Sequence, residues 1–587
     1  MSRPVAIYIA GTSRADEPHV LYALRCLRDF AAYVVIVGSD PALCGPRDLF
    51  VQHRGPRGMA IAAGLGAVGP DVGQVIVTGA HAFGPIGDLA GIAAAGHRLA
   101  PNGLVCGYFS GSARGAHPAP STDFMVLNGA LIARLARADL WQGPPDAVEE
   151  NLGSYLRAHG VPLASLSALT QGFAQGTAYD GTGLALAEGA PCLPCAIATM
   201  DPIYHDMAAQ DLRRILAQLR TCAPRLERAI HGFAARHIPA RDWAAITDAY
   251  AVLNEDGPVH LPHAALRIAV LMHVYFAEDF AELHAVARNI PTDFALFVSV
   301  ANDTAARRIA SHLAAQGAAA ATIRKVAQNR GRDMAALFIT FADVASSGDF
   351  DLILRLHSKR SPQLPPPVSA QFRTHLFSNL AASPAYVGAI LQRFADDPAL
   401  GLVMPPAIQI GFGTLGHGWY SNRAPLEDVA RKIGLSGPFD AHTPLAPFGT
   451  MFWFRPAALR ALFAYPWQFD DYNREPHHID GGLAHVQERL IGYAARAAGY
   501  DVLQVMTQAQ AARNYARLEY KFQRFAGHLM AASAPEQLIE LQRARPPRAL
   551  RLHAHLARAY ARLLRHTPRL RVWLRPFARR MSALLTG

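Results

Sequence analysis

The chain has 587 residues, of which 51% are hydrophobic and 17% are charged, and it contains six cysteines. This length predicts two or three domains, and the composition excludes both a disordered chain and a disulfide-stabilised scaffold. The formal net charge is +11, but residues 541–587 hold twelve arginines and no Asp, Glu or Lys, so the rest of the chain is nearly neutral and gives no reason to expect nucleic-acid binding.

The first part of the chain alternates strands with helices. Strands are predicted at 5–10, 33–38, 49–52 and 74–78, and helices at 18–30 and 59–65. This order predicts an α/β domain over residues 1–150. Residues 151–262 have a mostly helical pattern and are expected to form a connecting region.

A second α/β domain is expected over residues 263–510. Strands predicted at 266–276, 294–300, 322–326 and 350–357 alternate with helices at 278–289, 303–316 and 333–345, and a last helix spans 482–498. Because these strands are apolar, we expect a mostly parallel sheet that is covered by helices on both faces. Ligands of such sheets bind at the carboxyl ends of the strands.

The two parts share a local sequence pattern. The segment HRGPRGMA that begins at His53 resembles the segment NRGRDMA that begins at Asn329, with one gap. In each part a histidine, His81 or His357, follows 28 residues later, just after an apolar strand. We therefore predict two related α/β domains.

The two ends of the chain bear on localisation. No apolar run reaches 18 residues, and the N-terminal apolar stretch is typical of a strand, so we expect a cytoplasmic protein without a transmembrane helix. Residues 511–587 are predicted to form an arginine-rich helical tail in which leucines, Trp573 and Phe577 alternate with arginines. Such a helix could lie on an anionic membrane surface at the inner face of the cytoplasmic membrane, and a solvated basic helix is the alternative.

Three strand ends carry groups suited to a nucleoside diphosphate. Asn302 and Asp303 follow the strand at 294–300, where they could accept hydrogen bonds from a base or ribose or simply cap the next helix. In the segment Asn329–Asp333, Gly331 allows a phosphate to approach the backbone, and Arg330 and Arg332 lie at a helix start that favours anions. The alternative for this segment is a basic turn.

The strand at 350–356 is followed by His357, Lys359 and Arg360. Fixed cations at this point can neutralise the charge of a departing diphosphate. A solvated basic loop is an equally good interpretation.

The order of these motifs resembles the rhamnan-synthesis F family. The segments that carry the resemblance are HVY at 273–275, NRGRD at 329–333, LHSKR at 356–360, FGTMFWFRP at 448–456 and LAHVQERL at 483–490. It covers roughly residues 265–500 and implies GT-A/Rossmann-like domains. The family is associated with rhamnose-containing polysaccharides and O-antigen assembly, so the resemblance implies a glycosyltransferase. Its donor would be a nucleoside-diphosphate deoxyhexose such as rhamnose, and its acceptor a lipid-linked or growing surface polysaccharide.

The resemblance also implies roles for individual residues. Donor-binding residues would be His273, Asn302, Asp303, Asn329, Arg330, Gly331, Arg332, Asp333, His357 and Arg360, with Lys359 acting on the diphosphate. GT-A enzymes place an Asp-x-Asp metal motif where this chain has His357, Lys359 and Arg360, so we predict no metal ligands or other cofactor, although a divalent metal stays possible in principle. The first domain has His53 and Gly58 where the motif has Asn and Asp, so we expect it to bind acceptor or to brace the second domain.

The acceptor side leaves alternatives open. Trp453 could stack on a sugar ring and Arg455 could contact a phosphate, or both could belong to a core strand. Asp480 or Glu488 could be the general base, with a helix cap as the alternative for Asp480. The alternative for the whole protein is a non-catalytic glycan-binding or scaffold subunit of a polysaccharide assembly complex.

Overall fold

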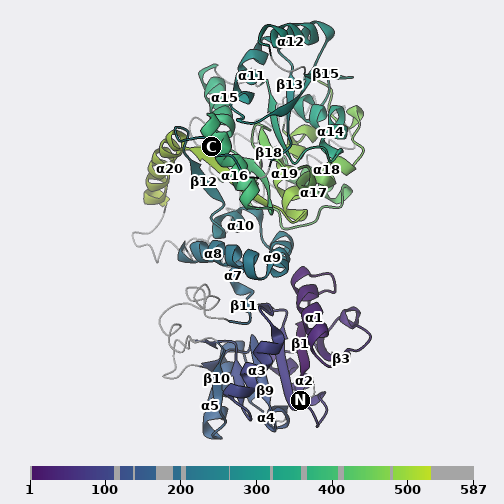
Figure 1. The fold of residues 1–587 in the computed structure, drawn as a ribbon, viewed down its shortest axis with the longest axis vertical. Coiled ribbons are helices and arrows are strands. Elements are labelled where there is room, and N and C mark those ends of the chain that lie inside the picture. Colours follow the sequence, from purple (N-terminus) through teal and green to yellow (C-terminus); the bar gives the residue numbers. More distant parts are fainter. Residues whose placement is uncertain are drawn as a thin grey trace.

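The computed structural model describes residues 3–110, 119–136, 139–166, 190–199, 206–263, 265–317, 321–358, 366–407, 416–475 and 480–529. Over these residues the protein contains two large β-sheets at opposite ends of its longest axis, each covered by helices (Figure 1). Most neighbouring strands in both sheets are parallel. The predicted α/β fold class with two mostly parallel sheets is thus confirmed.

The first sheet has seven strands. In spatial order these are β10 (Leu163–Ser165), β6 (Leu104–Cys106), β9 (Phe124–Asn128), β4 (Gln74–Gly79), β1 (Val5–Gly11), β2 (Val34–Gly38) and β3 (Leu49–Gln52). Strand β9 runs antiparallel to both of its neighbours. The helices around this sheet are α1 (Pro18–Phe30), α2 (Arg57–Gly66), α3 (Leu89–Leu99), α4 (Leu131–Ala136) and α5 (Pro145–Ala158).

The second sheet has eight strands. In spatial order these are β12 (Tyr250–Leu253), β19 (Asp501–Thr507), β17 (Leu400–Met404), β18 (Phe452–Phe454), β16 (Leu352–His357), β13 (Ile268–Val274), β14 (Phe294–Val300) and β15 (Thr322–Lys325). Strand β18 runs antiparallel to both of its neighbours. The edge strand β12 comes from residues that the sequence placed in the helical region, because its four residues are too short for a clear pattern.

Helices surround the second sheet on both faces. They are α11 (Phe280–Ala287), α12 (Asp303–Ala315), α13 (Arg332–Ala335), α14 (Ala342–Ser346), α15 (Pro366–Ala381), α16 (Pro384–Asp396), α17 (Arg423–Lys432), α18 (Arg460–Ala464), α19 (Leu483–Ala497) and α20 (Gln508–Leu529). The single helix expected at 333–345 is instead α13, a π-helical turn over Ala336–Thr340, and α14. Such π turns interrupt helices mostly at functional sites.

The two sheets have the same topology. Strands β3, β2, β1, β4, β9, β6 and β10 of the first sheet correspond in order and direction to β15, β14, β13, β16, β18, β17 and β19 of the second. In each sheet the fifth strand of this series is the antiparallel one. This common order agrees with the prediction of two related α/β domains.

Each sheet separates two hydrophobic cores. In β13, Ala269 and Leu271 face one core of the second sheet, whereas Val270 and Met272 face the other. The first sheet divides its side chains in the same way. Strands buried on both faces explain why the sequence reads as continuous apolar runs.

Short helices lie between the two sheets (Figure 1). They are α7 (Ala196–Thr199), α8 (Asp206–Cys222), α9 (Pro224–His237) and α10 (Ala240–Ile246). Their core includes Leu212, Leu226 and Trp243, together with Phe83 from β5 (Ala82–Phe83). Helix α9 contacts both α1 and α19, and so touches the helical layers of both sheets. No described helix combines the length and apolar character needed to cross a bilayer.

Candidate active site

The carboxyl ends of the central strands in the second sheet gather several predicted residues. Strand β13 is parallel to both β14 and β16, so His273 lies opposite Ser299 on one side and His357 on the other. Helix α13 begins at the same edge, which brings Asp333 to these strand ends. The parallel register therefore assembles residues that are far apart in the chain.

A half-buried carboxylate, that of Asp333, organises this edge. Its Oδ2 atom lies 3.1 Å from Nη2 of Arg355, accepts a hydrogen bond from the Thr450 hydroxyl at 2.5 Å, and lies 3.8 Å from Nε2 of His357. Arg355 is only 2% exposed and also donates to the backbone carbonyls of Asp333 and Thr450. We call Asp333, Arg355, His357 and Thr450 the Asp333 cluster.

His273 supports this cluster from the neighbouring strand. The side chain is buried, its Nδ1 atom lies 2.9 Å from the Ser299 hydroxyl, and its carbonyl accepts the Ser358 amide at 2.9 Å. Burial lowers the pKa of His273 to about 4, more strongly than the nearby Asp333 carboxylate raises it. The imidazole is therefore neutral near pH 7.

A strained turn completes the cluster. Gly449 and Thr450 both have left-handed backbone conformations, with φ values of +94° and +57°, and the latter is costly for a β-branched residue. The Gly449 carbonyl lies 2.8 Å from Nε2 of His357, and its amide donates to Oε1 of Glu488 at 2.6 Å. Glu488 is buried and its other oxygen pairs with Arg489. Its observed contacts hold the turn in place, and this burial argues against Glu488 as a general base.

The predicted arginines are held by a loop that the sequence did not single out. Arg330 forms an ion pair with Asp470 and donates to the Tyr472 carbonyl at 2.8 Å, and Nε of Arg332 donates to Glu475 at 3.1 Å. The guanidinium groups of Arg330 and Arg332 thus both have an acidic partner. These pairs join residues that are 140 and 143 positions apart, so no local pattern announces them.

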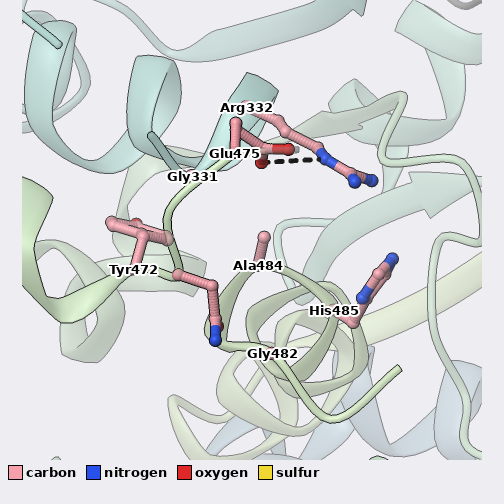
Figure 2. A pocket seen from close by; sticks show the side chains of 8 residues that line it. Gly331, Arg332, Tyr472, Glu475, Gly482, Ala484 and His485 are labelled. Atoms are coloured by element: carbon pink, nitrogen blue, oxygen red, sulfur yellow. Dashed lines mark hydrogen bonds and ion pairs between the residues drawn. The ribbon is translucent and has the colours of Figure 1, made fainter. Parts of the chain in front are cut away.

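This loop closes a small pocket at the start of α13. Figure 2 shows Arg332 and Glu475 on one side of it, His485 and Ala484 on the other, and Tyr472 at its end. The pocket encloses about 10 Å³, roughly the space of one water molecule. A nucleotide sugar cannot enter it while the Arg332–Glu475 ion pair is closed.

Gly331 is the residue type that fits the start of this helix. Its φ is +73°, and a Cβ atom would lie 2.5 Å from the ring of Tyr472. We expect Gly331→Ala to cost about 2–4 kcal/mol of unfolding free energy, because the strain of a left-handed residue adds to the overlap with the ring. Urea denaturation measures this. Gly317→Ala is the matched control, because Gly317 has a φ of +59° but open space around it, and an equal cost in both variants would contradict the ring contact.

Other donor-binding residues lie at the margin of this edge. Asn302 caps α12, since its side chain accepts the Ala305 amide at 2.9 Å, and the exposed Asp303 pairs with Lys325 at 3.1 Å. Asn329 is exposed. The capping interpretation of Asn302 is thus observed. Lys359 and Arg360 lie outside the described residues.

The predicted acceptor contacts of Trp453 and Arg455 are wrong. Trp453 is completely buried and donates to the Leu380 carbonyl, and Arg455 donates to the carbonyls of Leu400 and Phe394. Because β18 is antiparallel to β16, Arg455 lies toward the amino ends of the parallel strands, at the opposite edge from the Asp333 cluster. The core-strand alternative is the observed one.

Asp480 remains the better candidate for a base. Its half-buried carboxylate accepts a hydrogen bond from Asn422 at 3.0 Å and lies 4.0 Å from Nδ1 of His485. Helix α19 begins at Leu483 and its cap position is Gly482, so the alternative of a helix cap for Asp480 is not observed. Within the described residues, no three His, Cys, Asp or Glu side chains are placed to hold a metal ion.

Two central residues, Arg355 and Thr450, were missed by sequence reasoning. Arg355 left a signal, because it is a charged residue inside the apolar run FDLILRLH. A charge in a strand that is buried on both faces needs a partner, and Asp333 is that partner. Thr450 has no comparable signal in the sequence, because only the turn brings its hydroxyl to the cluster.

The fold and site define an α/β protein with two sheets of equal topology and a buried Arg–Asp–His cluster at the carboxyl edge of the second. Residues 248–500, which include this cluster, match the family described as Rhamnan synthesis protein F. The resemblance found in the sequence is thereby confirmed for this part of the chain.

Curated relatives cover a smaller part. The protein WxcX of Xanthomonas campestris pv. campestris, described as uncharacterized, is 31% identical over 178 residues in strain B100, which are 30% of this chain and 24% of that protein. The same values hold for strain ATCC 33913. The matched segment thus spans about a quarter of the length of these relatives.

Solved structures resemble the chain only weakly. The glycosyltransferase GlyE of Streptococcus pneumoniae TIGR4 is 10% identical, with 62% of this chain and 87% of that chain covered and a TM-score of 0.24. The 2-C-methyl-D-erythritol 4-phosphate cytidylyltransferase of Thermus thermophilus is 16% identical, with 30% and 91% covered and a TM-score of 0.18. Scores this low do not establish a common fold.

Proposed function

We propose that this protein is a glycosyltransferase that moves a deoxyhexose, rhamnose in the first instance, from a nucleoside-diphosphate sugar to a lipid-linked or growing surface polysaccharide such as an O-antigen. The observation that carries the proposal is the Asp333 cluster, which lies at the carboxyl edge of a parallel sheet within the segment matched to the rhamnan synthesis family. GlyE, by its name a glycosyltransferase, is consistent with this choice but adds no weight.

In this proposal the donor enters when the loop around Asp470 and Glu475 moves away. Arg330 and Arg332 then exchange their acidic partners for the diphosphate, whose oxygens can accept charge-assisted hydrogen bonds from both guanidinium groups. Gly331 allows the phosphate to approach the backbone. We assign Lys359 and Arg360, which follow Ser358 in the chain, to the same diphosphate. The Asp333 cluster positions this edge and binds hydroxyl groups of the donor.

We assign the general base to Asp480. Asp480→Asn is expected to lower kcat by about 100-fold or more while the protein stays folded, because the amide cannot take the proton of the acceptor hydroxyl. Steady-state kinetics measure this. Glu488→Gln is the comparison, and it is expected to lower the melting temperature through its contacts with Gly449 and Arg489. Normal turnover in Asp480→Asn would remove the assignment.

The decisive experiment is transfer or donor hydrolysis by the purified protein across a panel of nucleotide sugars, with and without EDTA. Turnover of a deoxyhexose donor supports the proposal, and turnover that survives EDTA supports cationic side chains as the charge-neutralising groups. Turnover of an unrelated donor would replace the sugar in the proposal without changing the class of reaction.

A non-catalytic glycan-binding or scaffold subunit is the second candidate. The observation that favours it is that Arg330 and Arg332 are already neutralised by Asp470 and Glu475. Measurable saccharide binding without turnover of any donor would support this candidate.

We also propose a location for the reaction. The twelve arginines of residues 541–587, interleaved with leucines and aromatic residues, are suited to the anionic inner face of the cytoplasmic membrane, where a lipid-linked acceptor is available. Binding of the full chain to vesicles with anionic lipid, and not to neutral vesicles, would test this. In this proposal residues 263–510 are the transferase domain, and the arginine-rich tail holds that domain at the membrane.

A further inference from the structure

A second polar cluster lies at the carboxyl edge of the first sheet. The Asp123 carboxylate, just before β9, has its Oδ1 atom 3.0 Å from Nη2 of Arg57 and 3.4 Å from Nε2 of His81. The Tyr108 hydroxyl donates to its Oδ2 atom. We call Arg57, His81, Tyr108 and Asp123 the Asp123 cluster.

The two clusters contain the same chemical groups at corresponding edges. In each, one carboxylate is contacted by an arginine, a hydroxyl group and a histidine. The histidine lies at or just after the end of the strand next to the antiparallel one. The arginine and the carboxylate come from different elements in the two clusters, however. In the second sheet Asp333 is the second residue of α13 and Arg355 lies in β16, whereas in the first sheet Arg57 is the first residue of α2 and Asp123 lies just before the antiparallel strand β9.

The structure explains why the carboxylate of the first sheet comes from another element. Gly58 occupies the position of Asp333 in the sequence pattern, and a Cβ atom there would lie 2.3 Å from the carbonyl oxygen of Trp141. No side chain fits, so an aspartate cannot be restored at this position. Asp123 supplies the missing carboxylate from the other side of the site. The first domain therefore keeps a carboxylate, an arginine, a histidine and a hydroxyl group, although some of them come from other elements than in the second domain.

The Asp123 cluster is partly open and has an unused donor. The side chains of Arg57 and His81 are 20% and 24% exposed. Nε of Arg57 is a buried atom without a hydrogen-bond partner. Burial lowers the pKa of His81 to about 3, whereas Arg57 keeps the pKa of Asp123 low although burial opposes this. The site therefore presents a neutral imidazole, an ionised carboxylate and a guanidinium.

We propose that the Asp123 cluster is a second ligand site. It binds a diphosphate ester, the same chemical class as the ligand proposed for the edge of the second sheet. Arg57 opens the ten-residue helix α2, whose first turn has no side-chain cap, so its guanidinium and free amides can bind phosphate oxygens together. Asp123 and His81 are placed to bind sugar or ribose hydroxyls. The inference rests on the proposed function, and the ester is either the nucleotide donor or a lipid-linked saccharide.

Calorimetric titration of the full chain with UDP, GDP, dTDP and farnesyl diphosphate tests this. We expect two binding sites per chain. Either one nucleotide fills both sites, or a nucleotide fills one and farnesyl diphosphate fills the other. The latter result identifies a lipid-linked saccharide as the second ligand. The variant Arg57→Gln/Asp123→Asn removes both charges together and is expected to lose one site, with at least tenfold weaker binding there. Arg332→Gln is expected to lose the other. Arg54→Gln, at an exposed neighbour, is the control with both sites intact.

The outcomes separate this inference from the proposed function. One site that only Arg332→Gln removes would overturn the inference and leave the proposed function standing. One site that only the double variant removes would support the inference and count against the role of the second sheet. If the double variant does not fold, hydrogen exchange of wild-type residues 53–66 decides: protection by the diphosphate is expected, and unchanged exchange at saturating ligand overturns the inference.

Discussion

Replacing Arg355 with methionine is expected to lower the free energy of unfolding by about 3–5 kcal/mol and to reduce transfer by about 100-fold or more. Arg355 is 2% exposed, and its guanidinium binds Asp333 and the carbonyl of Thr450. Without it, the half-buried Asp333 carboxylate loses this cation, and removal of one partner only is the costly way to break a largely buried pair. The loss of transfer follows because the cluster positions the groups that meet the donor.

The double variant Arg355→Met/Asp333→Asn separates the two effects. Removal of both charges is expected to restore at least about 1 kcal/mol relative to the single variant, without restoring transfer. Urea denaturation and donor turnover measure the two quantities. Arg267→Met is the control, because Arg267 is exposed and pairs with Asp351 at the amino ends of the strands, and both quantities should stay near wild type. An Arg355→Met protein as stable and active as wild type would contradict the central place of this cluster.

The second large effect concerns the helices between the sheets. His231 of α9 is buried, with Nε2 3.1 Å from Glu227 and Nδ1 3.0 Å from Asp501 at the start of β19. Burial alone would lower its pKa, but Asp501 and Glu227 raise it to about 10. An imidazolium with both ring nitrogens paired thus ties the connecting helices to the second sheet.

His231→Gln is therefore expected to lower stability by about 3 kcal/mol near pH 6, and by less as the pH rises. The folded pKa lies above the unfolded value of about 6.5, so the contribution is complete below pH 6.5 and is lost as the pH rises toward 10. Between pH 6.5 and 10, the unfolding free energy of the wild-type protein should approach that of the variant, and denaturation curves at several pH values measure this. His237→Gln is the matched control, because His237 is 41% exposed and its pair with Glu17 is worth less than about 1 kcal/mol. A constant difference between wild type and His231→Gln from pH 6 to 10 would show that His231 is not charged.

The sequence by itself determined the fold class and one edge of the site. Apolar runs that alternate with helices require a parallel sheet buried on both faces, and this places the groups after each strand at one edge. His273, Asp333 and His357 could therefore be predicted together. Gly331 could be predicted as a special backbone position, and the pattern shared by His53 and Asn329 pointed to two related domains.

Only the tertiary structure decided which groups meet. The three apolar residues of β18 do not indicate the direction of this strand in the sheet. Because β18 is antiparallel to β16, Thr450 lies at the site and Arg455 lies at the opposite edge of the sheet. The acidic partners of Arg330 and Arg332 come from a distant loop, so their charge balance could not be read locally. Glu488 was expected near an acceptor, but its helix turns it toward the Gly449 amide. Local patterns fix periodicity and backbone freedom, whereas long-range pairing of charges depends on how the chain is packed.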